Sequence, residues 1–248
     1  MAELSLHRFL KGARRWSVRE AERLIRGGRV AVDGVVTDRP EARVAPGAVV
    51  TVDGARVEAA AHEAPAVWLY HKPVGLVCTR RDEQGRRTIY DALPADLGYL
   101  FSVGRLDLMS EGALLLTRDG ELSRRLADPR FHVAKVYRVK VRGEVRPAAL
   151  TRLQAGVPLD GVRTRPCRIQ VEERAEGGTW TRWTLTEGKN RQIRRMAEAE
   201  GLAIQRLVRV AIAGLELGDL APGGLRRLDA AEVDALLAAT TGGEHGSR

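Results

Sequence analysis

The stretch Phe101-Ser102-Val103-Gly104-Arg105-Leu106-Asp107 leads from a short apolar run into a loop that carries an acid. A second apolar run, Gly112–Thr117, follows and is typical of a strand that ends at the turn Asp119-Gly120. Asp107 is therefore predicted on a connection between two strands, where anchored loops display catalytic groups. The same pattern also fits an Asp that merely caps a turn. Other segments of the chain decide between these two interpretations.

The composition indicates a soluble globular protein with a polyanionic partner. The chain has 248 residues, 44% hydrophobic and 29% charged, enough for one large domain or two smaller ones. Its 41 Lys and Arg exceed its 32 Asp and Glu, which gives a net charge of +9 and favours binding to nucleic acid. Arg supplies 36 of the basic residues and suits phosphate and base contacts. A GC-rich genome would also enrich Arg, but it would not set the sign of the net charge.

Several other classes of protein find no support in the sequence. Cys78 and Cys167 are far apart, so neither a disulfide framework nor a zinc site is indicated, and a reducing cytoplasm fits. The five His residues show no metal-ligand spacing. Charges interrupt the start of the chain, Met1–Arg15, so we expect no signal peptide there, and no apolar run reaches the roughly 20 residues of a membrane helix. We expect a cytoplasmic protein without membrane contact, and a monomer by default.

Residues 1–58 are predicted to form a separate module. The apolar spacing over 4–10 predicts a short amphipathic helix. A capping-box pattern at Ser17–Glu20 begins a second helix that runs through Ile25. Asp33-Gly34, which lies between two short apolar runs, indicates a hairpin.

The two predicted helices of this module are strongly basic. Between Ser5 and Arg29, eight basic residues are accompanied by only two acidic ones, which indicates RNA or DNA binding rather than a merely solvated helix face. Through the strings LHRFL, SVREAERLI and GRVAVDG the module resembles the α-L RNA-binding domain of ribosomal proteins, although Trp16 stands where a small residue is more usual. The residues predicted to contact RNA here are Arg8, Lys11, Arg15, Arg19, Arg23 and Arg26.

The rest of the chain is predicted to form a second, larger domain. The Ala-rich residues 59–66 are predicted to form a linker. Residues 67–239 are predicted to form the domain, and residues 240–248 a frayed tail. Short strands, such as Tyr137–Val141 and Trp183–Leu185, alternate irregularly with a few helices. This pattern predicts an α+β fold with a mainly antiparallel mixed sheet and flanking helices rather than a regular βαβ repeat.

Two helices of this domain are predicted from local patterns. Residues 187–196 are expected to open a helix that Gly201 ends, with Ile193, Met196 and Ala197 towards the core. Asp229 is expected to cap a last helix that runs through Leu237.

Four strings in this domain occur in an order that identifies a family. They are HKPVGLVCT at 71–79, VGRLD with SEGALLLTRDG at 103–120, KVYRV at 135–139 and EGKNRQIRRM at 187–196. Behind the basic N-terminal module, they resemble pseudouridine synthases of the branch that modifies ribosomal RNA, over nearly the whole chain. The sequence departs from the branch just after Asp107, where Met109 replaces a polar residue and Ser110 a Thr.

The resemblance implies an enzyme with a single catalytic carboxylate. Such an enzyme breaks the N1–C1′ bond of a uridine, turns the base and rejoins it through C5, without a metal or a cofactor. Asp107 is then the carboxylate, which either attacks C1′ or removes a proton to give a glycal. Arg194 is implied as its ion-pair partner, and Tyr137 as the ring that packs against the target base. Arg105 is implied to contact phosphate or to fill the space left by the extruded nucleotide.

The partner implied by the resemblance is ribosomal RNA or a pre-ribosomal particle. EGKNRQIRRM is closer to the large-subunit (23S) pattern than to that of small-subunit (16S) enzymes, which remain an alternative. A non-catalytic rRNA-binding assembly factor is a further alternative, against which the intact set of Asp107, Tyr137 and Arg194 argues. A nuclease or glycosylase would need paired acids, a metal cluster or a His pair. The further residues predicted to bind RNA are Lys72, Lys189, Arg191 and Arg195. Lys135 is assigned a role in the fold, and Glu187 and Asn190 are expected to shape the loop behind Asp107.

Overall fold

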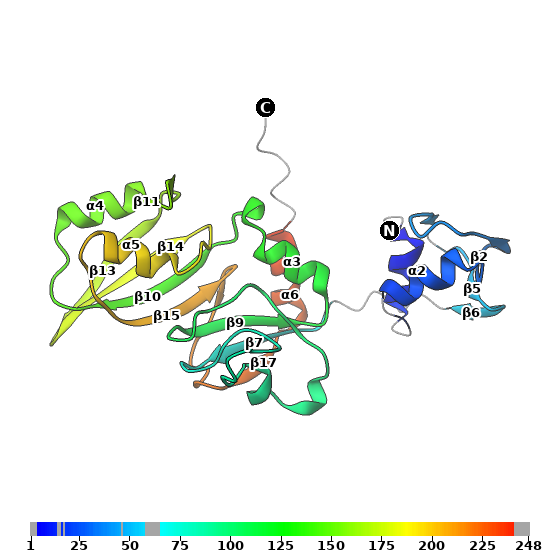
Figure 1. Ribbon diagram of the computed structural model, residues 1–248, viewed down its shortest axis with the longest axis horizontal. Coiled ribbons are helices and arrows are strands. Elements are labelled where there is room, and N and C mark those ends of the chain that lie inside the picture. The colour runs from blue at the N-terminus through cyan, green and yellow to red at the C-terminus, as the bar shows by residue number, and fades with distance from the viewer. Residues whose placement is uncertain (1–3, 14–15, 17, 46, 58–64, 241–248) are drawn as a thin grey trace. The chain divides into compact units, whose positions relative to one another are not determined.

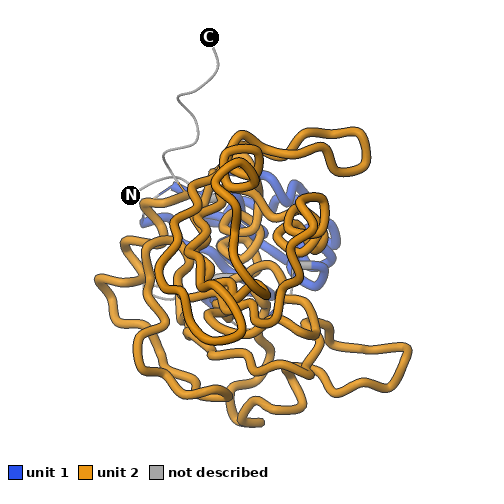
Figure 2. The backbone as a smooth tube through the Cα atoms, turned by 90° about the vertical axis from the view of Figure 1, so that its left-hand side faces the viewer, with its two compact units in different colours: residues 1–63 blue, residues 64–248 orange. Residues whose placement is uncertain are grey.

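The computed structural model describes residues 4–13, 16, 18–45, 47–57 and 65–240. The chain divides into two compact units, Met1–Glu63 and Ala64–Arg248 (Figure 2). Most of the predicted linker and residues 241–248 of the predicted tail lie outside the described residues. Thr240, where we expected the tail to begin, is buried, and its carbonyl accepts a hydrogen bond of 2.7 Å from Arg125. None of the described helices is both long and apolar enough to span a membrane.

The N-terminal unit packs two helices, α1 (Leu6–Gly12) and α2 (Val18–Arg26), against small sheets. The buried face of both helices is apolar, with Leu6, Leu10 and Ile25 fully buried. One sheet has the order β3-β2-β5-β6, and a second pairs β1 with β4. The strands are β1 (Leu4–Ser5), β2 (Val30–Val32), β3 (Val35–Val36), β4 (Arg43–Val44), β5 (Val50–Val52) and β6 (Ala55–Val57).

The predicted hairpin of this unit is confirmed. Strands β2 and β3 pair antiparallel, and the two residues between them, Asp33 and Gly34, have φ of 49° and 83°. Two successive positive φ angles are what a tight two-residue hairpin requires, and Asp-Gly tolerates them. The predicted first helix begins two residues late, because Leu4 and Ser5 belong to β1.

The larger unit is built on one mixed sheet with the strand order β13-β14-β10-β15-β9-β7-β17 (Figure 1). Every neighbouring pair in this order is antiparallel except β15 and β9, so the expected mainly antiparallel α+β fold is confirmed. The strands are β7 (Val67–Lys72), β9 (Glu111–Thr117), β10 (Lys135–Val141), β13 (Arg168–Ala175), β14 (Gly178–Leu185), β15 (Ile204–Ile212) and β17 (Leu225–Arg227). Shorter strands are β8 (Phe101–Ser102), β11 (Pro158–Leu159), β12 (Val162–Arg163) and β16 (Leu215–Glu216).

Helices surround this sheet. They are α3 (Gly120–Ala127), α4 (Pro147–Ala155), α5 (Gln192–Ala199) and α6 (Ala230–Ala238), with the 3-10 turns η1 (Tyr90–Ala92), η2 (Ala95–Leu97) and η3 (Pro129–Phe131). The expected turn at Asp119-Gly120 is instead the start of α3, because the Asp119 carboxylate accepts from the N–H groups of Glu121 and Leu122 and caps the helix. Asp229 caps α6 as predicted, in a capping box with Glu232.

The two faces of the sheet are covered differently. On one face, alternate residues of β7 and β9, such as Leu69 and Leu115, form a single core with α3 and α6. On the other face there are two separate cores. One joins Tyr70 and Leu114 to the segment between β7 and β8, and the other joins Trp183 to α4 and α5.

A row of four residues lies between these two cores. The strand register places Lys72 opposite Gly112, Gly112 beside Arg209 and Arg209 opposite Tyr137. Directly paired residues point to the same face of a sheet, so the four line the gap between the cores. We call them the central row. Gly112 is required there, because a Cβ would lie 2.2 Å from the Arg209 carbonyl oxygen.

Candidate active site

Asp107 lies on a tight turn between β8 and β9. The turn is closed by the Ser110 N–H, which donates to the Asp107 carbonyl at 3.0 Å, and its approach is fixed by the Val103 N–H, which donates to Leu115 at 2.8 Å. Leu106 is buried and donates its N–H to the Cys78 sulfur at 3.4 Å. The carboxylate of Asp107 is only half-buried, so a rigid backbone presents an acid that a ligand can reach.

Lys72, in the central row, holds the backbone of this turn. Its fully buried ammonium donates to three carbonyl oxygens, those of Pro73 (2.9 Å), Asp107 (3.2 Å) and Ser110 (2.8 Å). The prediction that Lys72 contacts phosphate is therefore wrong, because a buried amine with three carbonyl partners cannot reach RNA. Burial lowers the pKa of Lys72, and nearby Cys78 and Asp107 oppose that shift.

Arg194, on α5, contacts the same turn. No ion pair joins it to Asp107 within the described residues, contrary to expectation; its Nη2 instead donates to the carbonyl of Met109 at 2.7 Å. Burial and neighbouring Arg191 lower the pKa of Arg194, and Asp107 acts in the opposite direction. The Nε of Arg194 is buried and has no partner in the described part of the chain. Arg194 is thus a cation near the carboxylate that holds its backbone turn.

Tyr137 and Arg209 form the other end of the central row. The half-buried Tyr137 packs against both cores of this face, and the guanidinium carbon of Arg209 lies 6.0 Å from the centre of its ring. Arg209 is almost fully buried and donates from Nε to the Ala113 carbonyl at 2.6 Å, while its Nη2 has no partner in the described chain. Lys135, two residues before Tyr137 on β10, has its pKa lowered to about 8 by burial and by Arg209.

Sequence reasoning missed Arg209. No motif marks it, and RLVRV contains a second Arg, Arg206, that forms an ordinary ion pair with Glu111. The available signal was its place in an apolar strand: a charged residue at an inward position of β15 has to serve a purpose beyond solubility.

The rim of the site combines basic and apolar side chains. Arg105 is exposed immediately before the Asp107 turn. Met109 is 60% exposed and Val74 49%, and the two loops that carry them are joined by the Gly75 N–H, which donates to Leu108 at 2.8 Å. The buried Ser110 hydroxyl has no hydrogen-bond partner among the described residues. The departure at Met109 therefore places an apolar side chain beside the acid.

The remaining residues predicted to bind RNA are distributed over both units. Lys189 donates to the carbonyl groups of Val162 (3.5 Å) and Arg163 (3.4 Å), and Arg195 pairs with Asp160 at 2.6 Å, so both brace the β11–β12 hairpin. The side chains of Arg8, Arg19, Arg23, Arg26 and Arg191 are exposed, whereas Arg15 and the side chain of Lys11 lie outside the described residues.

The loop before α5 differs from the predicted position of its helix. The helix begins at Gln192 rather than near Glu187, because Arg191 takes a left-handed φ of 47°. Glu187 instead accepts from the Arg165 N–H at 3.0 Å and from the Gln192 side chain, which anchors the loop to the strand region before β13. As predicted, Ile193, Met196 and Ala197 are buried.

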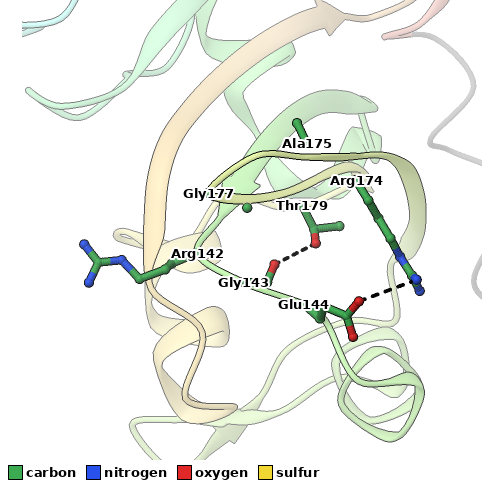
Figure 3. Close-up of a pocket in the computed structure, with 8 residues that line it drawn as sticks. Arg142, Gly143, Glu144, Arg174, Ala175, Gly177 and Thr179 are labelled. Atoms are coloured by element: carbon green, nitrogen blue, oxygen red, sulfur yellow. Dashed lines mark hydrogen bonds and ion pairs between the residues drawn. The ribbon is translucent and has the colours of Figure 1, made fainter.

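A hollow of about 410 Å³ lies elsewhere, at the far end of β10 (Figure 3). Figure 3 shows Arg142 directed away from it, while Arg174 pairs across it with Glu144 at 3.6 Å. Four residues of strand, or roughly 13 Å, separate Val141 beside this hollow from Tyr137. The hollow is thus remote from Asp107. Within the described residues, no group of three or more His, Cys, Asp or Glu side chains is placed to hold a metal ion.

The larger unit is an α+β fold that presents Asp107 on a turn held by Lys72 and Arg194. A model of the RNA pseudouridylate synthase family matches residues 66–199, and a model of the S4 domain matches residues 6–50. The chain belongs to the RNA pseudouridylate synthase family, as its motifs predicted.

Individual relatives agree with this assignment. Ribosomal large subunit pseudouridine synthase B of Pseudomonas aeruginosa is 41% identical over 225 residues, which cover 89% of this chain and 58% of that protein. The enzyme of the same name from Escherichia coli K12 is 40% identical over 238 residues, which cover 93% of this chain and 81% of that protein. A crystal structure of a pseudouridylate synthase superposes with a TM-score of 0.64 at 26% identity and covers 94% of this chain and 99% of that one.

Proposed function

We propose that this chain converts uridine to pseudouridine in ribosomal RNA of the large subunit, with Asp107 as the catalytic carboxylate. The names of the relatives support the substrate. The observation that carries the catalytic role is the position of Asp107: a partly exposed acid on a turn whose backbone accepts hydrogen bonds from Lys72 and Arg194. A turn acid with a purely structural role would not need two cations to hold its backbone.

The reaction is an isomerisation, so atoms and electrons balance within the nucleotide. The N1–C1′ bond breaks, the base turns, and a C5–C1′ bond forms; the proton that leaves C5 is matched by one gained at N1. The ionised form of Asp107 is required whether it attacks C1′ or removes a proton from the sugar.

Two cations, Lys72 and Arg194, lie near Asp107 and interact with it electrostatically. Both cations bond to the backbone of the turn, which leaves the carboxylate oxygens to the substrate.

Tyr137 and Arg105 are the residues that handle the base. The Tyr137 ring, supported from the sheet by Arg209, supplies a flat wall against which a turned uracil stacks. The exposed Arg105 contacts the phosphate of the target or occupies the place that the base leaves. The exposed Arg residues of α1 and α2 bind the RNA backbone and bring it to this unit. We further propose that the protein acts as a monomer in the cytoplasm.

The test compares the wild type with Asp107→Asn and Asp107→Ala on transcripts of both ribosomal RNAs. Pseudouridine is mapped by carbodiimide modification and counted by tritium release from uridine labelled at C5. We expect one modified uridine, in the large-subunit RNA, and no product from either variant, while both variants bind RNA as the wild type does. Product from Asp107→Ala would remove the catalytic role, and modification confined to the small-subunit RNA would correct the substrate. A wild type that binds both RNAs and modifies neither would favour an assembly factor.

A further inference from the structure

An exposed aromatic cluster lies at the end of β9 remote from Asp107. Tyr99 is 58% exposed and Phe101 is 38% exposed, and their rings meet edge to face with centres 4.9 Å apart. The guanidinium of Arg80 stacks on Tyr99 at 3.4 Å from the ring centre and faces Tyr90 at 4.2 Å. We call Arg80, Tyr90, Tyr99 and Phe101 the aromatic patch. None of these residues has a part in the catalytic proposal above.

The patch is held rigidly. Arg80 also donates to the Leu100 carbonyl. Its guanidinium is therefore held by this hydrogen bond and by its contacts with the two tyrosine rings. Phe101 belongs to β8, and its ring covers Gly120 at the start of α3, where a Cβ would lie 3.2 Å from the ring. Arg80 covers one side of Tyr99, yet the residue is 58% exposed, so part of its surface is free for another partner.

We propose that the aromatic patch is a second RNA-binding site, which stacks an unpaired nucleobase of the same RNA on Tyr99. Every base has a flat face, so an exposed tyrosine with a guanidinium behind it takes a base of any sequence. Arg118 lies nearby and donates to the Leu97 carbonyl at 3.0 Å. Its guanidinium favours the phosphate of that nucleotide as a partner over an apolar protein surface. The occupant is therefore RNA rather than a protein partner.

The position of the patch fits an RNA that also reaches Asp107. Phe101 pairs with Thr117, whereas Gly112 of the central row lies five residues earlier on the same strand. Five residues of strand span about 17 Å, or about five stacked nucleotides of one strand at ~3.4 Å each. Tyr99 cannot touch the target uridine at this distance, but it can hold a flanking nucleotide.

A photo-cross-link locates the contact directly. Large-subunit RNA transcribed with 4-thiouridine is irradiated with the full chain and digested with trypsin. Cleavage after Arg87 and Arg105 releases Thr88–Arg105, which contains Tyr99 and Phe101, while the catalytic turn lies in the separate peptide Leu106–Arg118. Fragmentation of the cross-linked peptides then locates the linked residue, because Thr88–Arg105 also contains Arg105. We expect RNA on Leu106–Arg118 and, within Thr88–Arg105, on Tyr99 or Phe101. RNA on Leu106–Arg118 or on Arg105 without any on Tyr99 or Phe101 would overturn the proposal.

Variants measure the contribution of the ring. Since base stacking contributes ~1–3 kcal/mol, Tyr99→Ala should weaken binding of the RNA about fivefold to hundredfold, with KM raised and kcat unchanged. Tyr99→Phe, which keeps the ring, should bind within about twofold of the wild type. Unchanged affinity in Tyr99→Ala, or an equal loss in both variants, would contradict the site. An effect of Tyr99→Ala on pre-ribosomal particles but not on free RNA would assign the patch to a protein partner instead.

A second Arg-stacked ring in the same unit provides the matched control. Arg138 lies over Trp180 at 4.7 Å on the other half of the sheet. Trp180→Ala should leave RNA affinity unchanged, and a loss equal to that of Tyr99→Ala would ascribe both effects to weakened packing and overturn the proposal. The inference rests on the proposed RNA substrate but not on its modification, since cross-link and affinity are read without turnover. A chain that cross-links through Tyr99 or Phe101 and makes no pseudouridine would refute the proposed function alone.

Discussion

The basic residues of α2, in the N-terminal unit, and those of the central row, in the larger unit, are used in opposite ways. In the N-terminal unit, Arg19, Arg23 and Arg26 are exposed along α2, while the apolar face of that helix forms the core. In the larger unit, Lys72 and Arg209 are buried in the sheet and donate to backbone carbonyl groups. Exposed cations attract a polyanion at long range and are screened by salt, whereas buried cations fix the backbone and are screened little. The same residue types therefore have different functions, which burial decides.

The largest effect is expected for Lys72→Met, and its absence would contradict the comparison. The variant removes a buried charge and leaves three carbonyl oxygens without their donor, at ~1–3 kcal/mol for each unsatisfied group. We expect kcat to fall at least about a hundredfold, because displacement of a catalytic group by ~1 Å has that effect. RNA affinity should stay unchanged, because the N-terminal unit is intact.

Single-turnover rates, filter binding and urea unfolding distinguish this outcome from simple unfolding. Lys189→Met is the matched control, since the Lys189 amine makes long hydrogen bonds, to exposed residues of β12. An RNA affinity that falls together with kcat would show that Lys72 acts on the substrate and not on the turn.

The sequence predicted the elements that local patterns define. Asp33-Gly34 specified its hairpin, Asp229 its capping box, and the spacing of Ile193 and Met196 the buried face of α5. Asp119-Gly120 was misinterpreted, because an Asp before Gly serves equally as a turn and as a helix cap, and only the contacts of α3 with the sheet select the second. Local sequence patterns therefore predict an element correctly where tertiary packing does not favour a different structure.

The central row could not be predicted, because it depends on pairing between distant strands. Lys72 and Gly112 are 40 residues apart in sequence, and Arg209 lies almost a hundred residues beyond Gly112. The motif containing Lys72 was recognised, but whether its amine faces RNA or three carbonyl groups depends on the Asp107 turn above it. Arg209 carried no motif, so only the register of β15 against β9 and β10 assigns it to the site.

An intermediate effect is expected when the exposed cations of α2 are removed, and it is seen in the salt dependence of RNA binding. In the triple variant Arg19→Gln, Arg23→Gln and Arg26→Gln, the slope of log K against log salt should fall by about one for each phosphate that no longer meets a guanidinium. Affinity at low salt should fall accordingly, and kcat at saturating RNA should stay unchanged. The measurement is RNA binding by fluorescence anisotropy over a range of salt concentrations.

The matched control for this variant is Arg29→Gln. Arg29 belongs to the same unit, but its guanidinium already pairs with Asp53. Removal of a cation that is already neutralised should change the salt slope less than removal of any one of the three exposed Arg residues. Equal slopes in the triple variant and the wild type would mean that α2 does not face the RNA.

The smallest effect concerns Lys135, whose pKa is lowered from 10.5 to about 8 by burial and by Arg209. Between these two values Lys135 binds more protons in the unfolded chain than in the folded one, so its contribution to the free energy of unfolding rises with pH through this window. Below about pH 8 the charged amine destabilises the fold fully, and above 10.5 the penalty is gone. In urea unfolding at a series of pH values, the difference in free energy of unfolding between the wild type and Lys135→Met should therefore rise with pH, whereas the difference between the wild type and Lys140→Met, on the same strand, should stay constant. A constant difference for Lys135→Met would mean that the amine is hydrated, and that the buried positive charge of this region belongs to Lys72 and Arg209 alone.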